Sequence, residues 1–207
     1  ICDSYACRRE KGTSFALRRV KKFLQATRSI YGSQTALYCL RMDISKFFAN
    51  ISWDVLLPTI FKTITCPKTQ RLIEKIVTEH RCLDLSSVPF DIISPHLRKG
   101  LPIGNLTSQL FANIYLNMLD QFVKHTLHVR WYARYMDDFL MIHPDKEYLK
   151  NKEDQIRAFL QEELHLMLSE RKVILSDVAD GVPFVGYRIF YDHILIRGKT
   201  LIRMQRK

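Results

Sequence analysis

The sequence lacks any run of about 18 apolar residues, the length typical of a membrane-spanning helix, and has no basic-then-apolar segment near its start. We therefore predict no membrane association and expect a cytoplasmic protein. No internal repeat or low-complexity segment occurs either, so the elements described below are expected to form one layered fold. The histidines are scattered, and none is assigned a role.

Cysteine is sparse and irregularly spaced. The five cysteines are odd in number and include no CxxC pair of the kind that holds zinc. Reduced thiols are the simplest interpretation. The residues are Cys2, Cys7, Cys39, Cys66 and Cys82.

Acidic residues are outnumbered, with 21 Asp and Glu against 32 Lys and Arg and a formal net charge of +11. Such an excess favours a polyanionic partner such as nucleic acid, although charge alone does not name the partner. With 207 residues and 47% hydrophobic content, the chain can bury a sizeable core.

Hydrophobic periodicity predicts an α+β fold in which helices pack on an antiparallel sheet. Ser14 is a candidate N-cap for a helix with an apolar face. That face would carry Phe15, Leu17, Val20, Phe23 and Leu24. Other helices are expected at 53–62, from Pro67 with Leu72, Ile73, Ile76 and Val77 inward, from Asn105 to Val123 with Leu106 and Leu110 on the apolar face, and at 146–166. Strands are expected at 36–42, 129–135 and 139–142, with a closing hairpin at 182–190 and 194–196, while 83–104 reads as loop or short strands.

An acidic turn is the sharpest local feature. Asp137 and Asp138 lie between two apolar strands, preceded by Tyr135 and Met136. Adjacent carboxylates repel each other and would point to opposite faces of a strand, so a bound cation is one reason to place both in a tight turn. On the pair alone, a solvated acidic turn is at least as good an explanation.

A third carboxylate, Asp43, ends another predicted buried strand. Three acids from neighbouring strands can hold two hard cations roughly 3.5–4 Å apart, one activating an attacking hydroxyl and the other stabilising the leaving phosphate oxygens. Mg²⁺ suits such ligands because it keeps water and substrate oxygens in its shell, and Mn²⁺ could substitute for it.

Five ordered segments resemble the motifs of reverse transcriptases. Residues 135–138 (YMDD) resemble the YxDD motif of that family, and residues 40–48 (LRMDISKFF) resemble the motif that bears its first catalytic aspartate. The similarity continues through residues 100–120 (GLPIGNLTSQLFANIYLNMLD), 164–175 (LHLMLSERKVIL) and 182–189 (VPFVGYRI). The resemblance implies a right-hand polymerase palm that extends a DNA or RNA primer on an RNA template with dNTPs.

The same resemblance implies which residues carry the chemistry. Asp43, Asp137 and Asp138 would bind two Mg²⁺ ions, with the backbone carbonyl of Ile44 as an additional ligand. Lys172 falls where the family commonly has a lysine near the pyrophosphate leaving group, where an ammonium can neutralise charge or donate a proton.

A dNTP pocket is implied by two further segments. The amides of Lys46 and Phe47 would lie near the triphosphate, and Phe48 would press its ring against the sugar 2′ carbon and exclude ribonucleotides. An ordinary core position is the alternative for Phe48. Ile103 and Gly104 occupy the frame in which related enzymes have a glutamine and a glycine near the incoming nucleotide.

Nucleic-acid contacts are implied at the catalytic turn and at the primer grip. Tyr135 and Met136 belong to the turn, whereas Phe184, Gly186 and Tyr187 lie in the segment that resembles the primer grip. Ordinary hairpin packing is an equal alternative for the side chains of that segment.

The lineage is suggested by residues 103–109 (IGNLTSQ), which resemble the form found in diversity-generating retroelements of the bacterial group II intron-like lineage. Residues 3–12 resemble their segment leading into the palm, which would place Arg8, Arg9 and Lys11 near template or phosphate, although a solvated basic turn is an alternative for each. The resemblance implies errors at template adenines, a template repeat RNA and an accessory protein.

The expected organisation is a partial fingers segment at 1–35, a palm with embedded fingers elements at 36–190, and at 191–207 the end of the primer-grip hairpin leading towards a missing thumb. This pattern suggests a fragment of a larger polymerase. Three alternatives stay open: a group II intron-type or other bacterial reverse transcriptase or maturase, a non-catalytic RNA-binding palm, and a basic α+β binding module without metal dependence.

Overall fold

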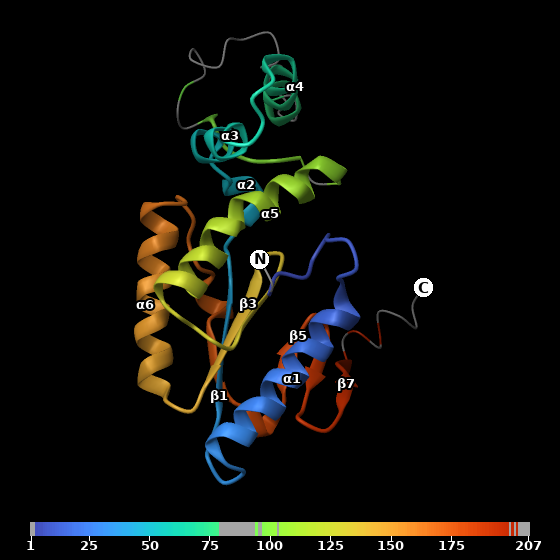
Figure 1. Cartoon of the computed structure of the whole chain (residues 1–207), viewed down its shortest axis with the longest axis vertical. Helices are drawn as coiled ribbons and strands as arrows, with labels where there is room; N and C mark the ends of the chain where they lie inside the picture. The colour runs from blue at the N-terminus through green and yellow to red at the C-terminus, as the bar shows by residue number, and fades with distance from the viewer. Residues whose placement is uncertain are drawn as a thin grey trace.

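The computed structural model describes residues 3–78, 94, 97–102, 104–198, 200 and 202. Its centre is a four-stranded antiparallel sheet in the order β2-β3-β1-β4 (Figure 1). The strands are β1 Tyr38–Asp43, β2 Tyr132–Tyr135, β3 Asp138–His143 and β4 Ile174–Asp177. Successive side chains alternate between the two faces of a strand, so each face carries its own set of apolar residues.

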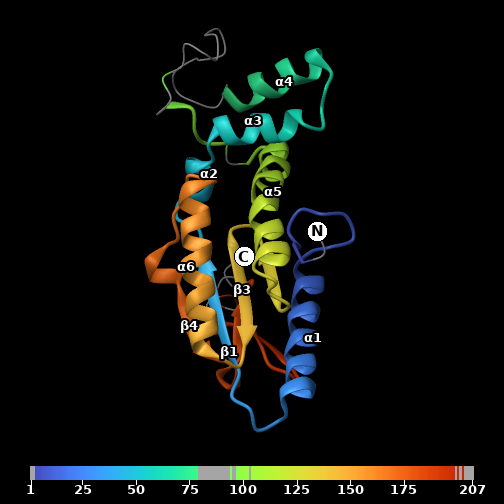
Figure 2. The same ribbon diagram turned by 60° about the vertical axis from the view of Figure 1, so that its left-hand side comes forward.

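Two long helices cover one face of this sheet. They are α5 Leu106–Gln121, which continues into the π-helical turn Phe122–Thr126, and α6 Lys146–Glu162. Figure 2 shows both helices running beside the strands. Leu40 and Met42 of β1 join Phe139 and Met141 of β3 in the larger core cluster with the buried residues of α5 and α6. The helices begin where expected because Asn105 and Asp145 accept hydrogen bonds from the first-turn amides.

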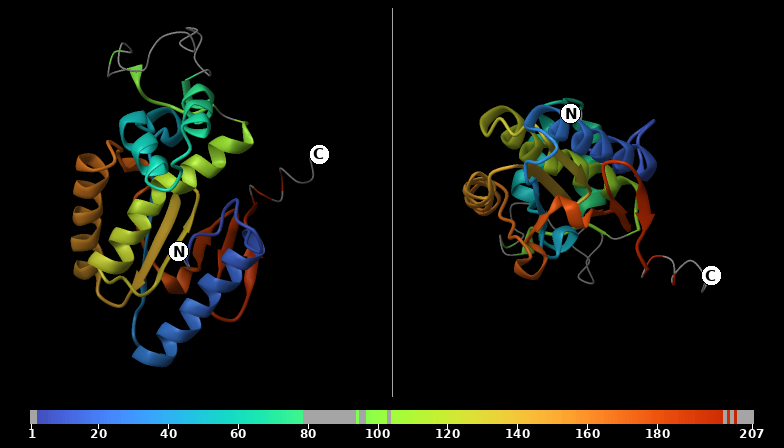
Figure 3. Two further views of the ribbon diagram at one scale, coloured as in Figure 1. Left: turned by 45° about the horizontal axis from the view of Figure 1, so that its top comes forward. Right: turned by 90° about the horizontal axis from the view of Figure 1, so that it is seen from below.

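The opposite face carries a second core. Here Cys39, Leu140 and Ile142 pack with the buried side of α1 Thr13–Tyr31 and with a three-stranded antiparallel sheet. That sheet consists of β5 Val182–Phe184, β6 Tyr187–Ile189 and β7 Ile194–Ile196. Figure 3 shows α1 alongside this small sheet. The central sheet is therefore covered on both faces, but by different layers.

Three shorter helices extend beyond the end of β1. They are α2 Phe47–Asn50, α3 Trp53–Phe61 and α4 Pro67–Thr78. The indole Nε1 of Trp53 donates to the carbonyl of Gly100 over 2.6 Å, and α3 packs on α5. This arrangement ties the α3 segment to the chain that leads into α5.

Several boundaries and faces differ from the sequence prediction. Helix α1 begins at Thr13 with Gly12, not Ser14, as N-cap, and Phe15 is exposed at its first turn. Leu72 of α4 is also exposed, as are Leu106 and Leu110 of α5. Hydrophobic periodicity identified these helices, but it does not show which helical turns pack against the rest of the protein and which are exposed.

The strands also differ in detail from the prediction. The strand expected at 129–135 is regular only from Tyr132, and the closing hairpin has three strands because residues 182–190 themselves fold back. Strand β4 and the 3-10 helices Glu170–Lys172 and Val178–Asp180 were not predicted. Ile103, Cys2 and Cys82 fall outside the described residues, as do residues 83–93, 95 and 96 of the segment expected as loop or short strands.

None of the helices in the described part of the chain has the length and apolar character of a membrane span. The described cysteines Cys7, Cys39 and Cys66 are free thiols. The division of the chain into fingers and palm segments stays a prediction.

Candidate active site

The three predicted acids meet at one edge of the central sheet. Asp43 is the last residue of β1 and Asp138 the first of β3, and the two are directly paired in the antiparallel register. The register of β2 with β3 pairs Tyr135 with Asp138 and leaves only Met136 and Asp137 as the connecting turn. Met136 has φ 53°, in the left-handed region. A two-residue turn thus places Asp137 beside the Asp43–Asp138 pair.

Lys172 reaches this site through a backbone pairing that the sequence did not predict. The amide of Ser45 donates to the carbonyl of Met167 and the amide of Ser169 to that of Asp43, each over 2.8 Å. The 3-10 helix Glu170–Lys172 follows at once, and Lys172 Nζ donates to Asp43 Oδ1 over 2.8 Å. The lysine predicted from the resemblance therefore contacts the first aspartate directly.

Arg41 is a site residue that the sequence analysis missed. Its Nε donates to Asp138 Oδ1 over 2.9 Å. Arg41 lies two residues before Asp43 in β1, and residues two apart share a face of a strand. That spacing is the signal that could have identified Arg41. A basic residue on the same face as Asp43 lies close to the acid at the start of the paired strand β3.

Burial and neighbouring carboxylates disfavour the ionised forms of Asp137 and Asp138. Burial and the charge of Asp43 raise the pKa of Asp137. Burial raises the pKa of Asp138 to about 6, with Asp43 and Asp137 adding to the rise and Arg41 opposing it. The hydrogen bond to Asp43 raises the pKa of Lys172, which keeps its ammonium charged.

The donor set fits hard divalent cations, although the part of the chain that the structure describes contains no ready-made cluster of three metal-ligating side chains. Two of the carboxylates instead accept from cations of the protein, Asp43 from Lys172 and Asp138 from Arg41. A bound cation would stabilise the ionised forms of Asp137 and Asp138, whose pKa values are raised. Mg²⁺ prefers oxygen ligands of this kind.

Asp138→Asn is expected to stabilise the metal-free fold at pH 7 by about 1–3 kcal/mol, each unit of pKa shift corresponding to about 1.4 kcal/mol. Because the folded-state pKa of Asp138 is about 6 against an ordinary 3.8, the folded protein binds this proton more tightly than the unfolded chain. The stability contributed at Asp138 therefore rises as the pH falls from about 7 through 6 towards 4. Denaturant unfolding in EDTA should give Asp138→Asn a higher free energy of unfolding than wild type at pH 7. The difference should be lost at pH 4.5. A variant less stable than wild type at pH 7 would contradict this.

The predicted dNTP-pocket residues follow β1 directly. Lys46 is exposed with φ 45° and serves as N-cap of α2. Phe47 is buried in the larger core, whereas Phe48 is half-buried and packs edge-on against it. Gly104 has φ 94° and lies exposed just before α5. The Phe48 ring is thus partly exposed whereas that of Phe47 is not, and the dNTP pocket stays a prediction.

The predicted nucleic-acid residues are distributed over two places. In the N-terminal segment, Arg9 is exposed, Arg8 Nη1 lies 3.3 Å from the carbonyl of Ser4, and Lys11 lies over the ring of Tyr5. The side chains of Arg8 and Lys11 therefore make contacts within the protein, and the nucleic-acid role of all three residues stays a prediction.

The second group lies at the acidic turn and in the small sheet. The hydroxyls of Tyr135 and Thr13 lie 3.2 Å apart. Phe184 is buried in the second core, so its side chain supports the sheet rather than facing a primer, while Tyr187 is half-buried and Gly186 has φ 83°. A Cβ atom at position 186 would lie 3.0 Å from Thr200 Oγ1, so a residue without a side chain suits this turn.

An acidic strand pair of this kind, on an antiparallel sheet backed by two helices, defines a polymerase palm, and sequence comparison identifies the family. Residues 4–189 match the family described as reverse transcriptase (RNA-dependent DNA polymerase), so the chain belongs to that family. It is 25% identical over 219 residues to Protein YkfC of Escherichia coli (strain K12), a match covering 90% of this chain and 54% of that protein. The chain therefore spans about half the length of this relative.

Solved telomerase structures share the fold. Apo telomerase from Candida tropicalis, truncated from its C-terminal domain, superposes with a TM-score of 0.67 at 14% identity, covering 94% of this chain and 41% of that one. Telomerase from Candida albicans, in complex with a TWJ fragment of telomeric RNA, gives a TM-score of 0.62 at 13% identity, covering 95% and 35%. The predicted α+β palm architecture is confirmed.

Proposed function

We propose that this chain is the catalytic palm of an RNA-directed DNA polymerase, which transfers a nucleotide from a dNTP to a primer 3′-hydroxyl on an RNA template. The observation that carries the proposal is the pairing of Asp43 with Asp138 across β1 and β3, with Asp137 in the adjoining turn and Lys172 on Asp43. A basic binding module or an RNA-binding palm without catalysis has no need for three partly buried, mutually repelling acids.

In this proposal Asp43, Asp137 and Asp138 hold two Mg²⁺ ions, together with the backbone carbonyl of Ile44. Such ions lower the pKa of the attacking hydroxyl and neutralise charge on the leaving phosphate. The protein itself supplies the fixed strand register that presents the acids. Arg41 orients Asp138 by its hydrogen bond, and Lys172 stands ready to move from Asp43 to the departing pyrophosphate, where its ammonium can donate a proton.

The proposed substrates are an RNA template, a DNA or RNA primer and dNTPs. The net charge of +11 suits two nucleic-acid strands. The relative from Candida albicans was solved with a fragment of telomeric RNA, which supports an RNA-binding role for this fold. In this proposal Phe48, which is half-buried and follows the Asp43 strand, selects against a 2′-hydroxyl.

A primer-extension assay with the full-length protein tests this proposal. A labelled primer on a defined RNA template should be extended with dNTPs and Mg²⁺, and EDTA should stop extension. RNA binding without any extension would favour the non-catalytic palm. Nucleic-acid binding that EDTA does not change and that does not distinguish RNA from DNA would favour the basic binding module.

The proposed lineage is that of diversity-generating retroelements, with a template repeat RNA and an accessory protein as partners, a group II intron-type enzyme being the alternative. The resemblance of residues 103–109 supports it. In the structure Asn105 caps α5 and Gln109 Oε1 accepts from Cys7 Sγ over 3.0 Å, so the segment both starts this helix and contacts the N-terminal segment.

Ile103→Gln is expected to lower misincorporation opposite template adenine by about threefold or more, because a glutamine amide can fix the nucleotide by hydrogen bonds and isoleucine offers only shape. Ile103 lies outside the described residues, so this prediction depends on the resemblance. Sequencing cDNA copied from one RNA by wild type, by Ile103→Gln and by Ile103→Gln with Gln109→Pro measures it. Gln109→Pro alone is the control, since it changes the end of the 103–109 motif without placing a glutamine amide at position 103. Equal adenine error rates in wild type and variant would mean that infidelity arises elsewhere or that the enzyme is an ordinary bacterial reverse transcriptase.

A further inference from the structure

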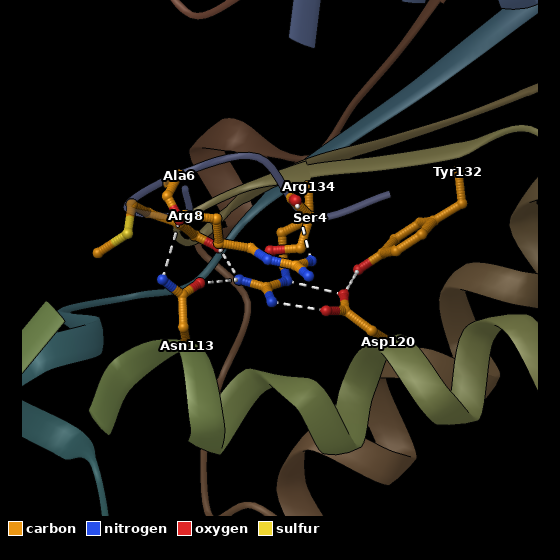
Figure 4. A network of polar contacts seen from close by, with 8 residues as sticks. Ser4, Ala6, Arg8, Asn113, Asp120, Tyr132 and Arg134 are labelled. Carbon is orange, nitrogen blue, oxygen red and sulfur yellow. Dashed lines mark hydrogen bonds and ion pairs between the residues drawn. The ribbon is translucent and has the colours of Figure 1, made fainter. Parts of the chain in front are cut away.

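A buried ion pair lies directly beneath the catalytic turn. Arg134 of β2 and Asp120 of α5 are 1% and 0% exposed. The guanidinium donates from Nε to Asp120 Oδ1 over 2.7 Å and from Nη2 to Oδ2 over 2.6 Å, and the hydroxyl of Tyr132 donates to Oδ1 over 2.7 Å. Figure 4 shows the guanidinium lying between Asp120 and Asn113. Buried charges are tolerated only when paired in this way.

The remaining donor of Arg134 reaches the turn itself. Arg134 Nη1 donates to the backbone carbonyl of Met136 over 3.0 Å and lies 3.4 Å from Asn113 Oδ1. Met136 immediately precedes Asp137 and has the left-handed φ of 53°, a conformation that a side chain other than glycine holds only when its surroundings enforce it. The guanidinium is therefore one of the contacts that enforce this conformation.

Arg134 and the Asp43–Asp138 pair lie on opposite faces of the central sheet. Residues two apart share a face, so Arg134 lies with Tyr132 on the side covered by α5, in contact with the larger core. Asp43 and Asp138 lie with Arg41, on the other side. Arg134 can therefore hold the turn from below without competing for the oxygens of the acids.

The backbone of Arg134 ties a third element to the same point. Its amide donates to the carbonyl of Asp3 over 2.9 Å, and the amide of Tyr5 donates to the carbonyl of Arg134 over 3.0 Å, which adds the N-terminal segment as a parallel edge to β2. Asn113 Nδ2 also donates to the carbonyl of Ala6 over 3.0 Å. The turn is thus braced simultaneously to α5 and to the N-terminal segment.

From this geometry we infer that Arg134, locked by Asp120, is a positioning residue that fixes the Met136 carbonyl and with it the placement of Asp137 for metal binding. The inference rests on the proposed two-metal function of the acids. A buried pair that served stability alone would not need a third hydrogen bond to the one strained residue of the turn. Arg134 touches no reacting atom and acts only through Asp137.

Two variants separate positioning from stability. Arg134→Lys keeps the charge but cannot form the bidentate pair and reach Met136 together, since an ammonium lacks the planar fork. Arg134→Met with Asp120→Leu removes both buried charges, a change that is often neutral for stability, and also removes the contact with the turn. Tyr115→Phe is the matched control, because it deletes other buried hydrogen bonds of α5, from the Tyr115 hydroxyl to the Leu164 carbonyl and from the Ser52 amide to that hydroxyl, neither of which involves Arg134 or Asp120.

The measurement is Mn²⁺ binding to the full-length protein by electron paramagnetic resonance, with thermal unfolding and primer extension alongside. Both Arg134 variants should bind Mn²⁺ about tenfold more weakly, as is usual when the support of a metal ligand is removed. Tyr115→Phe should lower the unfolding temperature and leave Mn²⁺ affinity unchanged. A folded Arg134 variant with wild-type Mn²⁺ affinity would overturn the inference, as would equal weakening by Tyr115→Phe. Wild-type protein that binds no Mn²⁺ and extends no primer would instead refute the proposed function beneath it.

Discussion

Asp43→Asn and Asp137→Asn are each expected to abolish primer extension, with a loss of about a thousandfold or more, while RNA binding stays within about twofold of wild type. Asparagine preserves the shape of the carboxylate and removes the charge that holds the metal ions. A thousandfold loss corresponds to about 4 kcal/mol of barrier, since each factor of ten is about 1.4 kcal/mol. Single-turnover extension of a labelled primer on RNA measures the rate, and filter binding measures RNA affinity.

The control for these variants is Glu147→Gln, which removes a carboxylate from the exposed first turn of α6, far from the β1–β3 edge. It should extend primers at the wild-type rate. Extension close to wild type by either aspartate variant would contradict the assignment of the acids. An equal loss in Glu147→Gln would point to general charge effects on nucleic-acid binding.

Phe48→Val is expected to raise ribonucleotide incorporation relative to deoxyribonucleotide by about ten- to a hundredfold, because a smaller side chain leaves room for the 2′-hydroxyl. The half-buried ring of Phe48 packs edge-on against Phe47, at a centroid distance of 5.4 Å. Its backbone carbonyl accepts from the amide of Leu101 over 2.8 Å, a bond that the substitution leaves in place. Competition between a dNTP and its ribonucleotide on one template measures the ratio.

The adjacent phenylalanine provides the matched control. Phe47 is 3% exposed in the larger core, so Phe47→Val should lower the free energy of unfolding by about 2 kcal/mol through lost packing and leave sugar selection unchanged. Unaltered selection in a folded Phe48→Val variant would assign Phe48 to the core as well. A selectivity change at Phe47 instead would mean that the two rings exchange roles relative to the prediction.

The sequence predicted the elements that have strong local signals. The strand that delivers Asp43, the turn at Asp137 and the helix that follows Asn105 all appear, as a short apolar run, an acidic pair and an apolar helical face predict. Strand β4 was missed because it is short and none of its residues is fully buried, so it shows no apolar alternation. Its role depends on pairing with β1, which is a long-range property.

Residues that act through tertiary contacts were harder to predict. Arg134 read as a polar residue in a strand, and nothing local shows that its side chain meets Asp120 in a buried pair. Asp120 did carry a signal, because it lies four residues after Leu116 and beside Leu119, on the buried side of α5. A charged residue within an apolar helix face indicates a buried partner. Arg41 required the register of β1 with β3, which the sequence did not fix in advance.

The most direct measurement of the proposed chemistry is anomalous diffraction from the full-length protein crystallised with a primer on RNA, an unreactive dNTP analogue and Mn²⁺. Two manganese peaks are expected between the β1 and β3 acids, with Asp43, Asp137 and Asp138 as ligands and Lys172 released from Asp43. A complete substrate complex with no manganese at these carboxylates would contradict the proposal that this palm polymerises DNA.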